Sequence, residues 1–228
     1  MKLLKNGLIY DGTGSDAYIA DILIDGEKIV KVEREIAAEE GWEVVDLDGL
    51  SVSSGFIDAH SHNDWFAIKN DTLKYFEPFI RQGITSFISG NCGISAVGFD
   101  KESPYADKMG AGLFGFSGTT GIYPTTREYF DAVDGNMPCN LALLAGHCTA
   151  RTSVAGYENR PLTSDERERM LELLEQALKD GACGLSLGLM YEPGIYADID
   201  ELKDVAKLCE KYDRPPQSGS YGQRDDRR

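Results

Sequence analysis

Residues 55–64 read GFIDAHSHND, a short apolar run followed by two histidines with one residue between them. Side chains two residues apart in a strand point to the same face, so His60 and His62 are expected to present their imidazoles side by side. Neutral imidazole is the commonest protein ligand for zinc-like ions. In parallel α/β folds ligands bind beyond the carboxyl ends of the strands, so this position favours half of a metal site over two unrelated histidines.

Strand and helix patterns alternate after this motif. Apolar runs predict strands over 51–59, 84–89, 141–145 and 184–189, and helical periodicity predicts helices over 72–81, 126–133, 164–179 and 200–211. Strands that alternate with helices indicate parallel strands covered by helices, in either a doubly wound sheet or a (β/α)₈ barrel.

Two details of this alternation are informative. The helix over 164–179 is the best marked, because Thr163 and Glu166 have capping-box spacing and Gly181 follows the helix. The Gly-rich stretch 101–121 is too long for an ordinary connection, which predicts an active-site loop or an insertion without regular structure.

The carboxyl ends of the later strands also carry residues of types that bind metals or substrates. Cys92 follows the second strand between two glycines, and although a lone cysteine is more often a buried apolar residue, its position beside the histidine pair favours a thiolate ligand. His147 follows the third strand and is open to three interpretations, a ligand, a substrate hydrogen-bond donor or a core histidine, of which a substrate-binding role without metal contact is favoured. Arg151 either holds a substrate carboxylate or forms a surface ion pair. Tyr191 follows the fourth strand and either contacts substrate or packs.

The first 50 residues predict a small antiparallel sheet without chemistry of its own. Residues 2–10 and 43–47 read as strands, and 19–32 reads as a hairpin that turns at Asp25-Gly26, where glycine supplies the positive φ that the turn requires.

Composition narrows the class of protein. The 228 residues carry a net charge of −15, which disfavours nucleic-acid and anionic-membrane partners. No signal-peptide pattern or apolar run of membrane-spanning length occurs, which predicts a cytoplasmic protein. Five irregularly spaced cysteines do not form a disulfide framework, so each is expected to be a free thiol or a metal ligand.

Four motifs in order carry a family resemblance: GFIDAHSHND at 55–64, GNCGIS at 90–95, GHCTAR at 146–151 and GLSLGLMYEPGIYA at 184–197. Together they resemble the N-acyl-D-amino-acid deacylases (D-aminoacylases) of the amidohydrolase superfamily. The resemblance implies a distorted (β/α)₈ barrel and a small β-sandwich formed by both chain ends. It also implies zinc-dependent hydrolysis of the amide bond of a small-molecule substrate, an N-acyl-D-amino acid.

The resemblance also implies roles for individual residues. His60 and His62 would be zinc ligands, and Cys92 would be the thiolate that replaces the bridging carboxylate of related enzymes, in a site for one or two ions. Tyr191 would help to bind the substrate carboxylate. Cys148 departs from the family pattern, which usually has glycine there.

The catalytic base is not identified. In the resembling family it is an aspartate after the last barrel strand, and two further histidine ligands come from strands five and six, all of them beyond residue 228. Asp64 is near enough in sequence to be considered, but it is better interpreted as a partner that orients a ligand histidine.

The end of the sequence breaks the pattern. A (β/α)₈ barrel takes about 250 residues, and residues 51–213 predict only its first half, about four βα units after the N-terminal part of the sandwich at 1–50. Residues 214–228 contain two adjacent prolines and no aliphatic side chain, and they carry a net charge of +2. This composition predicts an aberrant, disordered tail that supplies no central strand. It indicates a truncated or frame-shifted product, with a genuine short variant as the alternative.

A half barrel has consequences for function. Open edges at the first and fourth strands predict self-association, and an incomplete ligand set predicts that the fragment is inactive alone. One alternative is a non-catalytic metal-binding or assembly half of a split protein. Another is a cyclic amidohydrolase of the dihydroorotase or hydantoinase type, which is disfavoured because no lysine lies between Lys179 and Lys203.

Overall fold

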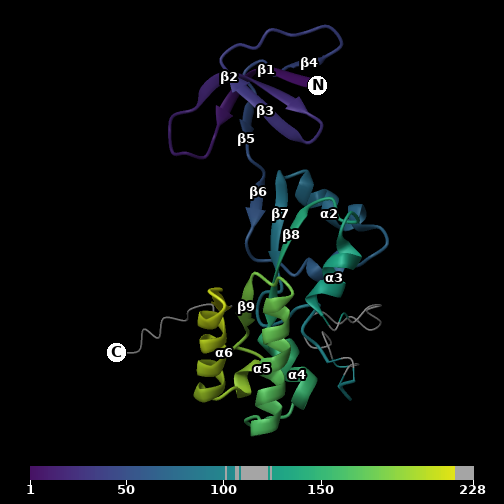
Figure 1. Cartoon of the computed structure of the whole chain (residues 1–228), viewed down its shortest axis with the longest axis vertical. Coiled ribbons are helices and arrows are strands. Elements are labelled where there is room, and N and C mark those ends of the chain that lie inside the picture. Colours follow the sequence, from purple (N-terminus) through teal and green to yellow (C-terminus); the bar gives the residue numbers. More distant parts are fainter. Residues whose placement is uncertain (101, 106–107, 109–122, 124, 219–228) are drawn as a thin grey trace. The chain divides into compact units, whose positions relative to one another are not determined.

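The computed structural model of the chain describes residues 1–100, 102–105, 108, 123 and 125–218. The chain divides into two compact units, Met1–Gly55 and Phe56–Arg228 (Figure 1). The first unit ends at Gly55, beyond the expected boundary at residue 50, because strand β5 (Ser51–Ser53) pairs with β1 (Lys2–Tyr10) of the N-terminal sheet.

The N-terminal unit is a single five-stranded sheet, and the sandwich to which it was expected to contribute stays a prediction. The order is β3-β2-β1-β4, with β5 also on β1, where β2 spans Tyr18–Asp25, β3 Lys28–Glu33 and β4 Glu43–Asp46. The predicted hairpin is confirmed, since β2 and β3 pair in antiparallel fashion. The all-antiparallel expectation is wrong, because β4 lies on the opposite side of β1 from β2 and runs parallel to β1.

Among its described residues, the second unit contains five parallel strands whose spatial order follows the chain. The order is β6-β7-β8-β9-β10, formed by Phe56–Asp58, Ile84–Ser89, Asn140–Gly146, Gly184–Leu187 and Pro216–Ser218. A doubly wound sheet reverses its strand order at a switch point, whereas successive barrel units add strands in one direction. The order therefore selects the barrel of the two predicted architectures.

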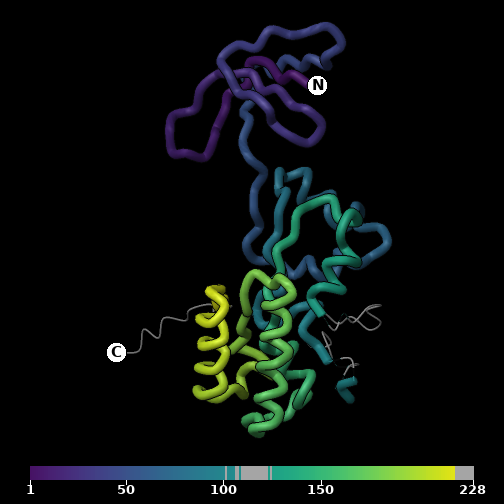
Figure 2. The backbone as a smooth tube through the Cα atoms, viewed as in Figure 1, coloured from purple at the N-terminus to yellow at the C-terminus, as the bar shows by residue number. Residues whose placement is uncertain are grey.

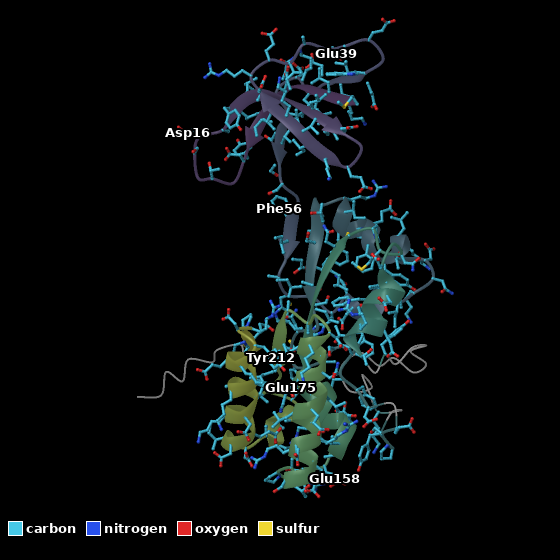
Figure 3. The ribbon with its side chains drawn as sticks, viewed as in Figure 1. Asp16, Glu39, Phe56, Glu158, Glu175 and Tyr212 are labelled. Atoms are coloured by element: carbon cyan, nitrogen blue, oxygen red, sulfur yellow. The ribbon has the colours of Figure 1, made fainter. Side chains whose placement is uncertain are left out.

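Helices connect these strands. They are α1 (Asp64–Ala67), α2 (Thr72–Ile80), α3 (Thr126–Val133), α4 (His147–Ala155), α5 (Ser164–Lys179) and α6 (Ile199–Lys211), with a 3₁₀ turn at Gly194–Tyr196. The predicted capping box at Thr163 is present. The backbone trace in Figure 2 shows α5 and α6 side by side, and the Tyr212 hydroxyl at the end of α6 donates to Glu175 of α5 at 2.7 Å (Figure 3).

Two apolar clusters bind the helices to the sheet. Leu174 of α5, Leu185 of β9 and Val205 of α6 belong to one, and Phe87 of β7 and Tyr129 of α3 belong to the other. All five side chains are buried, so each cluster removes apolar area from water between a strand and its covering helices. In the described part of the chain, none of the helices has both the length and the apolar character that a membrane span requires.

Three expectations about secondary structure need correction. The strand predicted over 51–59 is two strands, β5 and β6, in different sheets. Helix α4 was not predicted, because nearly all of its side chains are buried and it lacks the one-sided apolar pattern of a surface helix. Helix α1 was not predicted either, because it is a single turn.

A further correction concerns the tail. Pro216–Ser218 form β10, which pairs in parallel with β9 from Leu185 to Leu187. Proline is compatible with this position because β10 is the terminal strand of the described sheet and needs a partner on one side only. The rest of the predicted tail, 219–228, and most of the predicted loop at 101–121 lie outside the described residues.

Candidate metal centre

The three predicted ligands lie together at the carboxyl edge of the parallel sheet. The ligand atoms of His60, His62 and Cys92 are all within 4.8 Å of one another. The Cys92 Sγ atom is 3.3 Å from His60 Nε2, and the two imidazole rings are nearly perpendicular at 80°. Strand alternation does not produce this arrangement, because β6 ends at Asp58 and both histidines follow it.

The loop after β6 is fixed against the neighbouring strand. The Asp58 carboxylate accepts from the His60 N–H at 3.1 Å and turns the chain at the end of the strand. The Ser61 N–H then donates to the Ile88 carbonyl of β7 at 3.1 Å. Since Cys92 follows β7 directly, this pairing brings the histidines to the cysteine.

The three donors fit a divalent ion of the zinc type. Around one tetrahedral ion, nitrogen and sulfur donors with bonds of about 2.0–2.3 Å lie roughly 3.5 Å from one another, close to the 3.3 Å between Cys92 Sγ and His60 Nε2. Burial, and then the neighbouring His60, lower the pKa of His62 to about 4. His62 is therefore neutral at neutral pH, which is the form that binds metal.

Cys92 has an unusual backbone conformation. Its φ of +59° lies in the left-handed region, between Gly90 at +76° and Gly93 at +74°. A side chain with a Cβ atom rarely adopts this conformation, and such residues persist where surrounding contacts fix them. The conformation marks the loop over residues 90–93 as a constrained element of the site.

Asp64 stabilises the segment over residues 90–96 by accepting hydrogen bonds from its backbone. Its carboxylate is fully buried and accepts from the backbone N–H groups of Ala96 at 2.8 Å and Gly90 at 3.4 Å. Burial raises the pKa of Asp64 to about 7. One carboxylate oxygen thus binds the backbone at the start of the cysteine loop and the other binds Ala96 just after it. This role differs from the base and from the histidine partner considered for Asp64.

Gln217 of β10 contacts the cluster although its segment was predicted to be a disordered tail. Its amide nitrogen lies 3.3 Å from His60 Nδ1, while its buried amide oxygen has no hydrogen-bond partner. The two amide atoms are interchangeable by a flip. In the flipped form the oxygen accepts from His60 Nδ1–H, which leaves the Nε2 lone pair facing Cys92.

His147 and Arg151 lie in a buried polar network. His147 Nε2 is 2.7 Å from Glu201 Oε1, and Arg151 Nη1 donates to both Glu201 oxygens at 2.7 and 3.0 Å. Arg151 also donates to the Pro193 and Arg160 carbonyls. All three side chains are at most 1% exposed. His147 does not belong to the ligand cluster, and Arg151 is neither a surface ion pair nor open to a substrate in this structure.

Sequence reasoning missed Glu201, and no sequence signal marks it. It stands in the first turn of α6 beside Asp198 and Asp200, where acidic residues are ordinary helix-terminal features. Only its contacts with His147 and Arg151 of α4 distinguish its carboxylate from its neighbours.

Tyr191 does reach the site. Its hydroxyl donates to the Cys92 carbonyl at 2.6 Å. Burial, followed by an interaction with the Cys92 side chain, raises the pKa of Tyr191 well above its usual value, so the phenol stays protonated.

The chain thus contains barrel-type βα units that bring two imidazoles and a thiol together at the carboxyl edge of the sheet, and these are donors of the kind that bind zinc-type ions. The amidohydrolase family model matches residues 43–214, and the chain belongs to that family.

The chain is also similar to individual proteins of known name. The chain is 32% identical to an N-acyl-D-aspartate deacylase of Alcaligenes xylosoxydans xylosoxydans over 209 residues, which cover 90% of this chain and 40% of the relative. The crystal structure of an N-acyl-D-glutamate deacylase from Bordetella bronchiseptica, complexed with zinc and a phosphonate inhibitor, matches with a TM-score of 0.81 at 32% identity. The match covers 95% of this chain and 44% of that one.

A D-aminoacylase crystal structure matches similarly, with a TM-score of 0.82 at 30% identity over 96% of this chain and 44% of that one. These matches confirm the predicted partial barrel. The chain spans about two fifths of the length of the curated relative.

Proposed function

We propose that this chain supplies the His60, His62 and Cys92 side of a zinc site that hydrolyses the amide bond of N-acyl-D-amino acids. The observation that carries the proposal is the convergence of the three donor atoms within 4.8 Å, at the sheet edge where barrel enzymes place their chemistry. Similarity to deacylases of N-acyl-D-aspartate and N-acyl-D-glutamate supports the substrate class.

The side chains of the site have distinct roles in this proposal. A bound divalent ion supplies Lewis acidity for amide hydrolysis. His60 and His62 provide neutral nitrogen donors, and Cys92 provides a thiolate whose negative charge offsets part of the charge of the ion. Within the described residues, the cluster includes no carboxylate that would serve as a base. We therefore infer that the 228-residue chain alone does not turn over substrate.

Zinc binding tests the site directly. We expect the chain to bind zinc, and Cys92→Ser to weaken binding by at least about 100-fold, because losing a ligand costs more than the 10–100-fold typical of its supporting partners. Competition with a chromophoric chelator measures the affinity. Cys139→Ser is the matched control, since Cys139 lies outside the cluster. Equal affinities for the Cys92→Ser variant and the wild type would contradict the proposed ligand set.

Turnover tests the reaction. The zinc-loaded chain is assayed with N-acetyl-D-aspartate and N-acetyl-D-glutamate, alone and after co-expression with the part of the Alcaligenes deacylase that the chain does not cover. Hydrolysis of the D but not the L isomers on reconstitution supports the proposed reaction. Turnover by the chain alone would contradict the inference that the 228-residue chain is inactive without a second part.

A non-catalytic metal-binding or assembly role is the second candidate, because the cluster within the described residues has three ligands and no carboxylate. This role predicts zinc binding and a stable complex with the co-expressed part of the Alcaligenes deacylase. It predicts no hydrolysis by the chain alone or by that complex.

A further inference from the structure

The left-handed backbone of Cys92 needs contacts that hold it, and β9 and the segment after it provide them. Cys92 follows β7, whereas β9 lies two strands away in the sheet, with β8 between them. The loop crosses the end of β8 at Gly146, where a Cβ atom would lie 2.3 Å from the Gly93 carbonyl oxygen. Only glycine permits this close passage.

Ser186 of β9 holds both sides of the cysteine. Its Oγ atom accepts from the Gly93 N–H at 2.9 Å and donates to the Gly90 carbonyl. The Ser186 side chain is completely buried. One hydroxyl therefore joins the two residues that flank the Asn91-Cys92 segment.

Tyr191 holds the cysteine itself. Its hydroxyl donates to the Cys92 carbonyl at 2.6 Å, and the approach depends on Gly188, where a Cβ atom would lie 2.1 Å from the same carbonyl oxygen. A hydroxyl has one hydrogen to donate. In this structure that hydrogen is directed at the Cys92 carbonyl, and the substrate-carboxylate contact that the family resemblance implies for Tyr191 stays a prediction.

We propose that Ser186 and Tyr191 are positioning residues that fix the backbone of Cys92 and thereby aim its thiol at His60. The proposal rests on the metal site proposed above for its chemical purpose. Its structural content, a cysteine held by two hydroxyls, is testable without metal.

Tyr191→Phe is the test variant, because it deletes one hydroxyl and keeps the ring. Tyr196→Phe is the matched control, since its hydroxyl pairs with Glu192 of the same segment and does not contact the cysteine loop. In the metal-free protein, the rate of Cys92 alkylation by iodoacetamide is followed by peptide mass spectrometry, with Cys139 and Cys183 as internal references. We expect a several-fold faster reaction of Cys92 in Tyr191→Phe only, because the loop opens more often.

The zinc-loaded protein gives a second readout. We expect Tyr191→Phe to weaken zinc binding about tenfold, the range typical of residues that support a ligand, and to alter the thiolate-to-cobalt absorption of the cobalt-substituted protein. The Tyr196→Phe control should retain both properties.

The outcomes separate the two proposals. If the wild type binds no zinc, the proposed function fails, yet faster alkylation in Tyr191→Phe still supports the positioning role. Unchanged alkylation and unchanged zinc affinity in Tyr191→Phe would overturn that role. Should Tyr191→Phe fail to fold, judged by its helical circular-dichroism signal, Ser186→Ala is measured in the same assays and decides the matter by the same criteria.

Discussion

Glu201 shows how one carboxylate can organise a large part of the second unit. Glu201 lies on α6, and its carboxylate contacts both the Arg151 guanidinium and the His147 imidazole of α4. Through Arg151 the network extends to the carbonyls of Pro193 and Tyr196, in the segment that follows Tyr191. A buried cation needs its anion, because water cannot replace the lost partner. The network thus fixes the segment that follows Tyr191 of the candidate site.

Replacing Glu201 with glutamine should destabilise the second unit by about 3–5 kcal/mol, because the buried Arg151 cation loses its counter-charge. Urea unfolding followed by the helical circular-dichroism signal measures the change, since the described helices all lie in this unit. Glu210→Gln, an exposed change on the same helix, should stay within about 0.5 kcal/mol of wild type. A loss for Glu201→Gln as small as the control's would show that the ion pair contributes no net stability.

At the scale of the element, Glu166 at the start of α5 both caps the helix and pairs with Arg160. Glu166 accepts from the Thr163 N–H at 2.8 Å to close the capping box, and it accepts both guanidinium N–H groups of Arg160 at 2.7 Å. The hydrogen bonds from Arg160 lower the pKa of Glu166 to about 2. The carboxylate form is therefore the one that stabilises the helix.

This lowered pKa predicts a pH dependence. A depressed carboxyl pKa gives stability that is present above the unfolded value, about 4.3, and lost as the pH falls through about 2. We expect the difference in unfolding free energy between wild type and Glu166→Gln to be constant above about pH 5 and to shrink towards pH 2. Urea titrations across this range measure it. For Glu168→Gln, an exposed change on the same helix, the difference in unfolding free energy from wild type should not depend on pH. A difference for Glu166→Gln that does not change with pH would contradict the role given to Glu166.

At the scale of the molecule, the parallel sheet has two terminal strands among the described residues, β6 and β10. Phe56 and Ile57 of β6 are 61% and 66% exposed. Unpaired strand edges with apolar side chains favour pairing with another chain. The net charge of −15 opposes that association through repulsion between copies.

Self-association is therefore predicted to depend on salt. The Debye length falls from about 10 Å at 0.1 M to about 3 Å at 1 M ionic strength, so sedimentation velocity should show more oligomer at higher salt. Ile57→Lys should reduce the oligomer, while Leu73→Lys, an equally drastic change at an exposed position of α2, should not. A monomer at every concentration and salt level would exclude association through this edge.

Much of the fold follows from local sequence. The hairpin turn at Gly26, the Thr163 cap and the apolar runs over 84–89 and 164–179 act through neighbouring residues. Their elements therefore occur where predicted, with the turn one residue later, at Gly26-Glu27. The positions of His60, His62 and Cys92 at strand ends followed from the same patterns, because the carboxyl ends of successive parallel strands share one edge.

The remaining features depend on residues far apart in sequence. The Tyr191 hydroxyl and the Cys92 carbonyl are 99 residues apart, Gln217 and His60 are 157 apart, and β10 forms from a Pro-containing segment with no strand pattern. A hydrogen bond requires two specific atoms within about 3 Å, and no local pattern encodes that distance. The sequence by itself determined which residues are able to bind metal and on which strand ends they stand. Only the tertiary structure decided which side chains hold them in place, because those contacts exist only once the sheet has aligned its strands.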